Sequence, residues 1–170
     1  MSTSASVRSA TSSAADSVVF ELDGREVTAA PGESLWQVAR REGVAIPHLC
    51  HSAEPGYRAD GNCRVCMVEI AGERVLAASC VRKPTPGMKV TTGSDRAVAA
   101  RSLVMELLLT DQPERSVAPD SDSKLWRWAD RIGVTRSRFP RGGEPPAVDR
   151  SHPAMTVRLD ACIHCGLCVR

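Results

Sequence analysis

Apolar and polar positions alternate at Val18, Phe20 and Leu22, and this period of two predicts a half-buried strand. Asp23-Gly24 follows at once and is typical of a two-residue hairpin turn, so residues 25–29 supply the returning strand. The patterned part of the chain therefore begins with a β-hairpin.

A short amphipathic helix is predicted next. Ser34 and Gln37 form the sequence signature of a capping box at a helix start. Leu35 and Val38 begin one apolar face, and Gly43 can end the helix because glycine tolerates the left-handed conformation.

A second hairpin contains two cysteines. Residues 67–70 alternate, residues 71–72 permit a turn, and residues 75–78 run back. The midpoint of positions 66 and 80 falls at 73, in the turn region, so we expect the hairpin to set Cys66 and Cys80 opposite one another at its open end.

The predicted order is hairpin, helix, cysteine-containing loop, hairpin and a short strand at 89–92. A small mixed sheet packed on one helix, in the manner of a β-grasp fold, accommodates this order. The fold class expected for residues 18–93 is therefore α+β.

Residues 94–133 are expected to be helical. After a cap at Ser94, apolar residues recur at the spacing of one helix face, namely at Ala100, Leu103, Val104, Leu107 and Leu108. A polar linker at 112–123 separates this helix from a shorter one that contains Trp126 and Trp128 and ends at Gly133. We interpret both tryptophans as packing residues.

The remaining segments carry less pattern. Residues 1–17 are rich in Ser, Ala and Thr and lack an apolar run, so we interpret them as a disordered tail rather than a secretory signal. Residues 134–156 are rich in Arg, Pro and Gly and are predicted to form an extended connector. Residues 157–170 contain a second group of cysteines and form the last predicted domain.

Composition narrows the function. The 42% hydrophobic and 25% charged residues are typical of a soluble globular protein, and a net charge of +2 with 4% aromatics argues against a nucleic-acid partner. No apolar run approaches the roughly 18 residues that span a membrane, so no membrane partner is expected. Seven cysteines, some only two residues apart, favour metal binding in a reducing cytoplasm, with disulfides as the alternative.

The first cysteine set suits an iron–sulfur cluster. Gaps of twelve, two and thirteen residues separate Cys50, Cys63, Cys66 and Cys80. Four thiolates close a [2Fe–2S] centre, and Gly61 lets the backbone approach and donate N–H groups to sulfur. Arg58 or Arg64 can offset negative charge there, although a solvated arginine is the commoner case.

Two other interpretations of this region stay open. A structural zinc ion with four cysteine ligands would make the chain a binding module, although such sites usually pair two short C-x2-4-C knuckles and this set has one short gap. His48 and His51 flank Cys50, and we interpret them as neighbours of the ligands or surface residues rather than ligands.

The second set, Cys162, Cys165 and Cys168, follows the opening of the bacterial C-x2-C-x2-C-x3-C-P run for a [4Fe–4S] cluster. The sequence stops inside this motif. We therefore expect an incomplete [4Fe–4S] site in a truncated ferredoxin-type domain, and a longer polypeptide that completes it. His164 is interpreted as a spacer.

Several stretches together resemble one family. They are SLWQVA at 34–39, IPHLC at 46–50, GNCRVCMVE at 61–69 and LAASC at 76–80. The resemblance, over about residues 18–110, is to the [2Fe–2S] ferredoxin-like domain at the front of the large iron–sulfur subunit of complex I, of NAD-reducing hydrogenase subunits and of NAD-dependent formate dehydrogenase alpha subunits. It implies a β-grasp fold and a [2Fe–2S] cluster held by the first four cysteines.

A finer resemblance concerns the C-terminal half. WRW at 126–128, SRFP at 137–140, SHPAM at 151–155 and LDAC at 159–162 look most like formate dehydrogenase alpha subunits. Many relatives carry a His and three Cys for another [4Fe–4S] cluster after the long helix. No cysteine occurs between Cys80 and Cys162, which weakens the hydrogenase and complex I alternatives.

The finer resemblance implies an electron relay. In such enzymes a molybdenum or tungsten pterin oxidises formate, and electrons pass to a beta subunit that carries FMN and reduces NAD. The expected partners are the C-terminal catalytic part and this flavin- and NAD-binding subunit. The chain itself would carry no catalytic residue and would transfer single electrons. The alternatives are an electron-transfer subunit of an NAD-reducing hydrogenase, the corresponding subunit of complex I, or a free-standing small ferredoxin.

Overall fold

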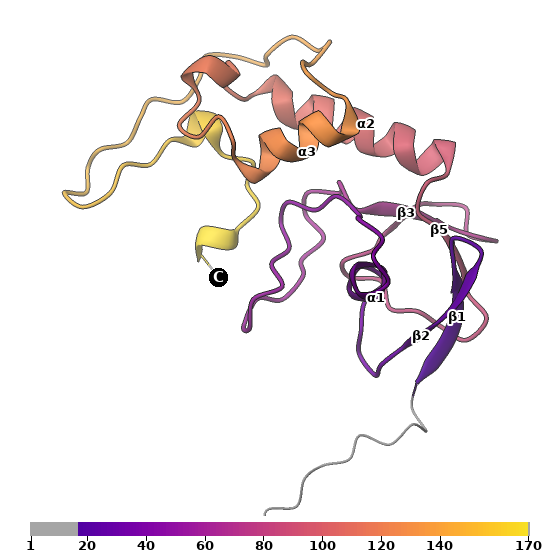
Figure 1. Ribbon diagram of the computed structural model, residues 1–170. Coiled ribbons are helices and arrows are strands. Elements are labelled where there is room, and N and C mark those ends of the chain that lie inside the picture. The colour runs from indigo at the N-terminus through magenta and orange to yellow at the C-terminus, as the bar shows by residue number, and fades with distance from the viewer. Residues whose placement is uncertain (1–16, 170) are drawn as a thin grey trace, which may run out of the picture.

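The computed structural model describes residues 17–169, so the predicted tail at 1–17 lies outside the described residues except for Ser17. The sheet and α1 (Leu35–Arg41) form one layered unit. Helices α2 (Asp95–Thr110) and α3 (Lys124–Ile132) lie side by side beyond it, in the upper part of Figure 1. The α+β class is confirmed.

Five short strands form a mixed sheet in the order β2-β1-β5-β3-β4. Their bounds are Val18–Leu22 for β1, Arg25–Ala29 for β2, Met67–Ile70 for β3, Ala77–Ala78 for β4 and Lys89–Thr91 for β5. Strands β1 and β2 form the predicted hairpin, with φ of 50° at Asp23 and 77° at Gly24 in the turn. Strand β5 pairs parallel with β1 and antiparallel with β3, and so joins the two hairpins into one sheet.

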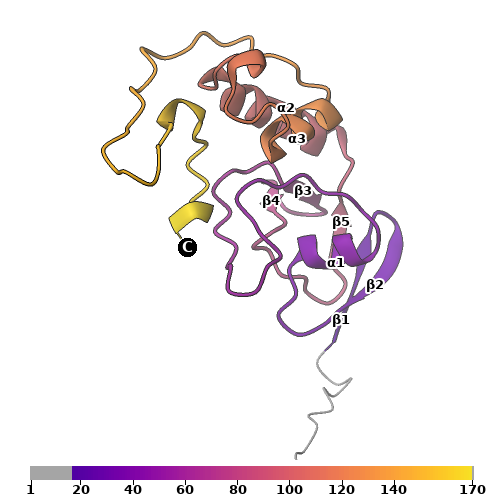
Figure 2. The same cartoon turned by 60° about the vertical axis from the view of Figure 1, so that its left-hand side comes forward.

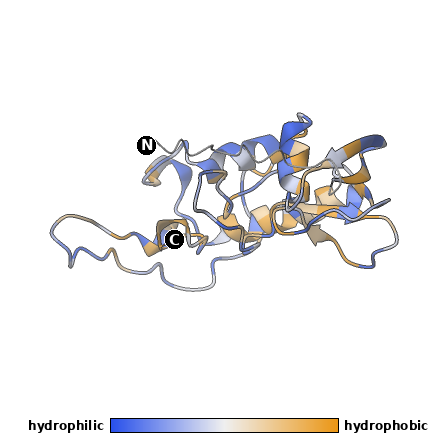
Figure 3. Ribbon diagram, turned by 90° about the horizontal axis from the view of Figure 1, so that it is seen from below, coloured by the Kyte–Doolittle hydropathy of each residue, from blue (hydrophilic) through white to orange (hydrophobic). Residues whose placement is uncertain are grey.

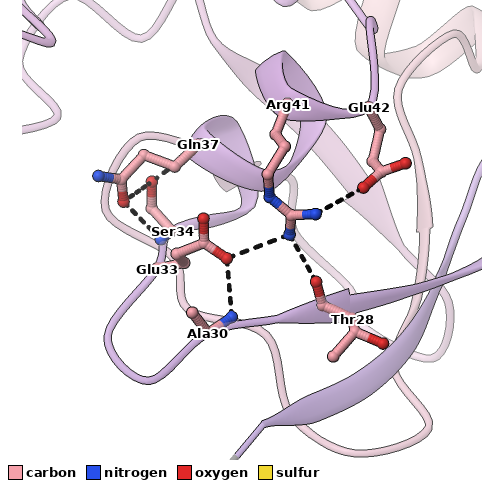
Figure 4. A network of polar contacts seen from close by, with 7 residues as sticks. All are labelled: Thr28, Ala30, Glu33, Ser34, Gln37, Arg41 and Glu42. Carbon is pink, nitrogen blue, oxygen red and sulfur yellow. Dashed lines mark hydrogen bonds and ion pairs between the residues drawn. The ribbon is translucent and has the colours of Figure 1, made fainter. Parts of the chain in front are cut away.

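Helix α1 begins with the predicted capping box. Ser34 Oγ accepts a hydrogen bond from Gln37 N at 3.3 Å, and Gln37 Oε1 accepts one from Ser34 N at 2.8 Å (Figure 4). At the other end, the Arg41 guanidinium donates to Thr28 O at 2.5 Å, which ties α1 to β2. Gly43, with φ of 78°, follows the end of the helix as expected.

The core of this unit lies between α1 and the sheet. It includes Phe20, Leu22, Leu35, Val38, Val68 and Val90, all of which are at most 2% exposed. Burying this apolar surface stabilises the fold by roughly 25 cal/mol per Å². The same packing holds the loops at the edge of the sheet in position.

Replacing Ser34 by Ala is expected to lower the free energy of unfolding by about 1 kcal/mol, because Gln37 N loses its side-chain acceptor. Urea unfolding measures the difference. Ser121→Ala, in an exposed part of the loop before α3, is the control and is expected to change stability by less than about 0.5 kcal/mol. Equal losses in the two variants would contradict a stabilising role for the cap.

The second hairpin differs from its predicted register by one residue. The register of β3 against β4 sets Cys66 opposite Ser79 rather than Cys80, and Ser79 N donates to Cys66 O at 3.1 Å. The returning strand is also shorter than the predicted 75–78, since the reversal, with turns and bends, extends over residues 71–75. A wider and less symmetric reversal shifts the pairing, so a midpoint argument placed Cys80 one position too early.

Helix α2 begins at the predicted Ser94 cap but buries a different face from the predicted one. Its buried residues are Ala97, Arg101, Met105 and Leu109, whereas Leu103 and Leu107 are 41% and 51% exposed. Arg101 is the reason, because its Nε donates to Met67 O at 2.8 Å and satisfies the charge inside the packed face. A charged residue on that face concealed the apolar series Ala97, Met105 and Leu109.

The segment beyond α2 folds back on the helices. A 3-10 turn at Arg115–Val117 interrupts the predicted linker, and the Arg115 guanidinium forms an ion pair with Asp130 of α3 at 2.8 Å. Helix α3 ends at Gly133, which has φ of 80°, and Trp126 is 8% exposed, as its role in packing predicts. Hydrophobic and hydrophilic residues are interspersed along the helical segments (Figure 3). None of the described helices is both long and apolar enough to cross a membrane.

Candidate metal centre

The first four cysteines come together where two hydrophobic clusters meet. Cys66 and Cys80 flank the open end of the β3–β4 hairpin and pack with the sheet and α1. Cys50 and Cys63, from the loop between α1 and β3, pack with residues of α2 and α3. All four are buried, with exposed fractions of 0% to 7%.

Side-chain hydrogen bonds join the four thiols. Cys50 bonds to both Cys63 and Cys80, and Cys80 also bonds to Cys66. The thiols of Cys63 and Cys80 donate to Cys50, which lowers the pKa of Cys50 and raises those of Cys63 and Cys80. The Cys80 thiol likewise lowers the pKa of Cys66 to about 6. The site therefore favours thiolates at two of its four sulfurs even without a metal.

Backbone N–H groups point at these sulfurs. Cys63 N donates to Cys50 Sγ at 3.4 Å, and Asn62 N also donates to Cys50. Val65 N donates to the sulfur of Cys63, and Cys80 N to that of Cys66. Such donors stabilise negative charge on sulfur, as an iron–sulfur cluster requires.

Two residues in the left-handed region shape this loop. Gly61 has φ of 66°, and an added Cβ would also lie 3.4 Å from the Val81 side chain. Arg64 has φ of 55°, which is uncommon for a residue with a side chain and is consistent with strain stored at a functional site. The predicted need for glycine at position 61 is thus met by its backbone conformation.

The predicted cations are not the ones nearest the sulfurs. Arg58 is 84% exposed on its side chain and pairs with Asp60, and Arg64 is exposed. Two cations that the sequence analysis missed act on the site instead: Arg101 lies in the electrostatic range of Cys66, and Lys124 in that of Cys63, Cys50 and Cys165.

Each missed cation leaves a signal in the sequence. Arg101 interrupts an otherwise apolar i, i+4 series on α2. Lys124 occupies the first turn of α3, where the helix dipole disfavours positive charge. Burial lowers the pKa of Lys124, and the thiols of Cys63, Cys50 and Cys165 oppose that shift.

The histidines pack beside Cys50. His51 is 6% exposed, and its ring centroid lies 4.6 Å from that of Trp36. His48 packs between Trp36 and Trp128, at 4.5 and 5.9 Å. Burial and the positive charge of Lys124 lower the pKa of His48 to about 4, so it is neutral at pH 7. Of the two roles expected for these histidines, the burial of His51 favours a neighbour of the ligands over a surface residue.

The second cysteine set lies next to the first. Cys165 and Ile163 pack against the cluster that contains Cys50 and Cys63, and both views show the C-terminal segment beside the cysteine loop (Figure 2). His164 N donates to Cys162 Sγ at 3.3 Å, with φ of 51° at His164. Cys162 and Cys165 are partly exposed and Cys168 is exposed.

The donor chemistry fits an iron–sulfur cluster. All seven cysteines lie in the described part of the chain and none forms a disulfide. Among residues 17–169, no group of three or more His, Cys, Asp or Glu side chains is arranged to hold a single metal ion, and the thiols hydrogen-bond to one another. Loading a cluster would replace these hydrogen bonds by iron–sulfur bonds and release the thiol protons.

Residues 15–95 match the family described as a 2Fe-2S iron-sulfur cluster binding domain. The chain is 34% identical over 166 residues to the mitochondrial NADH-ubiquinone oxidoreductase 78 kDa subunit of Candida albicans, and covers 23% of it with 95% of its own length. It is also 34% identical over 157 residues to the NADP-reducing hydrogenase subunit HndD of Solidesulfovibrio fructosivorans, and there covers 27% with 89% of its own length. The chain thus spans about a quarter of the length of these curated relatives.

A solved structure agrees with these relatives. A crystal structure of an NAD⁺-reducing [NiFe]-hydrogenase in the H2-reduced state matches 89% of this chain and 64% of its own, with a TM-score of 0.79 and 32% identity. The chain therefore contains an iron–sulfur electron-transfer domain of the kind found in NADH- and NAD-linked oxidoreductases. This [2Fe–2S] domain belongs with those of the NADH-quinone oxidoreductase and NAD-reducing hydrogenase subunits.

Proposed function

We propose that Cys50, Cys63, Cys66 and Cys80 are the ligands of the [2Fe–2S] cluster and that the chain relays single electrons through it. The observation that carries this proposal is the convergence of four buried thiols, with backbone N–H groups directed at their sulfurs. Such a cluster, when bound, supplies one-electron transfer at a potential set by charge, burial and hydrogen bonds. The chain holds the sulfurs and excludes water from them.

Anaerobic reconstitution with iron and sulfide tests this proposal against the zinc alternative. We expect visible absorption, about two irons per chain, and an EPR signal after chemical reduction. A colourless, EPR-silent protein that binds stoichiometric zinc would overturn the proposal. Iron, sulfide and zinc analyses of the same preparation separate the two outcomes.

We propose in addition that Cys162, Cys165 and Cys168 supply three ligands of a [4Fe–4S] cluster that is completed by a longer polypeptide. In its support, His164 N donates to Cys162 Sγ just as Val65 N donates to Cys63 Sγ, so both sets use a backbone donor two residues after a cysteine. The packing of Cys165 beside the first set would place the two centres next to each other in a relay.

The whole protein is proposed to be a cytoplasmic, NAD-linked formate dehydrogenase. Its alpha subunit would add a molybdenum or tungsten pterin, and a partner subunit would carry FMN and bind NAD. The absence of cysteine between Cys80 and Cys162 and the short motifs at 126–162 support this choice. The exposed Leu103 and Leu107 on α2 offer apolar surface for further parts of the enzyme.

A subunit of an NAD-reducing hydrogenase or of complex I is the second candidate, and the similarity to such proteins favours it. Assays of the complete native enzyme separate the candidates. Formate-dependent NAD reduction without hydrogen-dependent reduction would support the first, whereas hydrogen-dependent or quinone-linked activity without formate oxidation would reject it.

A further inference from the structure

Lys124 stands between the two cysteine sets. It is the first residue of α3, and its Nζ donates to His51 O at 3.0 Å, next to Cys50 in the chain. Its neighbour Leu125 packs in the cluster that also contains Cys50, Cys63 and Cys165. The ammonium is thus held beside the sulfurs by both a hydrogen bond and the packing of its helix.

The strongest electrostatic partners of Lys124 are sulfurs rather than carboxylates. Among the described residues, the ionisable groups that act on it most strongly are the thiols of Cys63, Cys50 and Cys165 and the guanidinium of Arg127. A cavity of about 370 Å³ opens beside Lys124, and its lining contains Arg40 and Arg131 but no Asp or Glu. The positive field of Lys124 is therefore available to the sulfurs.

We propose that Lys124 raises the reduction potential of the [2Fe–2S] centre by stabilising its reduced state electrostatically. This inference rests on the proposed function of the first four cysteines. Reduction adds one electron and one negative charge to the centre, and no covalent bond forms or breaks. A half-buried cation near Cys50 and Cys63 interacts more favourably with the more negative state, and solvent screens it incompletely.

The hydrogen bond to His51 O and the charge can be separated by substitution. Lys124→Gln keeps an N–H donor but removes the charge, Lys124→Met removes both, and Lys124→Arg keeps both. Arg127→Met is the matched control, because Arg127 lies on the same helix, is 54% exposed on its side chain, and pairs with Asp122. It removes one positive charge at a site that faces solvent.

The experiment is an EPR-monitored redox titration of the reconstituted 170-residue chain, with dithionite as the reductant and redox mediators. We expect Lys124→Met and Lys124→Gln to shift the reduction equilibrium about tenfold toward the oxidised state, a lowering of about 59 mV for one electron. Lys124→Arg and Arg127→Met are expected to retain the wild-type potential.

The outcomes distinguish this inference from the proposal on which it rests. Wild-type protein that binds no [2Fe–2S] cluster would refute the ligand assignment. A cluster present in all variants with an unchanged potential in Lys124→Gln would refute the role of Lys124. If only Lys124→Met lowered the potential, the hydrogen bond rather than the charge would be responsible, and the inference would also fail.

Discussion

Replacement of Cys66 by Ser is expected to abolish the reduced-state EPR signal of the [2Fe–2S] centre, or to alter it markedly. Cys66 lies 1% exposed at the start of β3, and its backbone is tied to the opposite strand by Ser79 N at 3.1 Å. The side chain therefore stays in place while soft sulfur is exchanged for hard oxygen, a poor ligand for these clusters. Iron content and EPR after anaerobic reconstitution measure the loss.

Cys168→Ser provides the matched control for this experiment. Cys168 is exposed and belongs to the second set, so its substitution is expected to leave the [2Fe–2S] signal at the wild-type level. Cys63→Ser should behave like Cys66→Ser, because Cys63 is also buried and receives a hydrogen bond from Val65 N. A wild-type signal in either buried variant would show that the cluster is held elsewhere.

Phe20→Ala is expected to lower the free energy of unfolding by about 3–5 kcal/mol. Phe20 is 2% exposed in the middle of β1, between the hairpin partner Val27 and the residues of α1. Removing the ring leaves a cavity in a core that the rigid sheet cannot easily close. Urea unfolding of the chain under one set of reconstitution conditions measures the effect.

Val19→Ala is the control in the same strand. Val19 points to the other side of β1 and is 45% exposed, so its truncation is expected to cost less than about 1 kcal/mol. Similar losses for the two variants would contradict the assignment of the core to the Phe20 side of the sheet. Loss of the cluster together with stability in Phe20→Ala would show that the same core supports the cysteine loop.

Features that depend on near neighbours in the chain were predicted from the sequence. The Asp23-Gly24 turn, the Ser34 cap and the helix end at Gly133 all form as expected. Each is specified by backbone preferences and hydrogen bonds within a few residues, which the order of amino acids contains directly. The cysteine spacing likewise indicated which four thiols would meet.

The charges at the site could not be predicted in the same way. Arg58 and Arg64 were chosen because they lie near the cysteines in sequence, yet both are exposed to solvent. Lys124 and Arg101 reach the sulfurs from helices that follow the domain in the chain. Their positions depend on how α2 and α3 pack, which is a sum of many distant contacts.

The sequence by itself determined the four cysteines, the hairpin and helix order, and the caps that begin and end the helices. Only the tertiary structure decided that Cys66 faces Ser79, that α2 buries Arg101 rather than Leu103, and that Lys124 stands beside the sulfurs. The physical reason is range. Turns and caps are satisfied locally, whereas strand register and helix faces are chosen by whichever distant surfaces bury the most apolar area and leave no polar group without a partner.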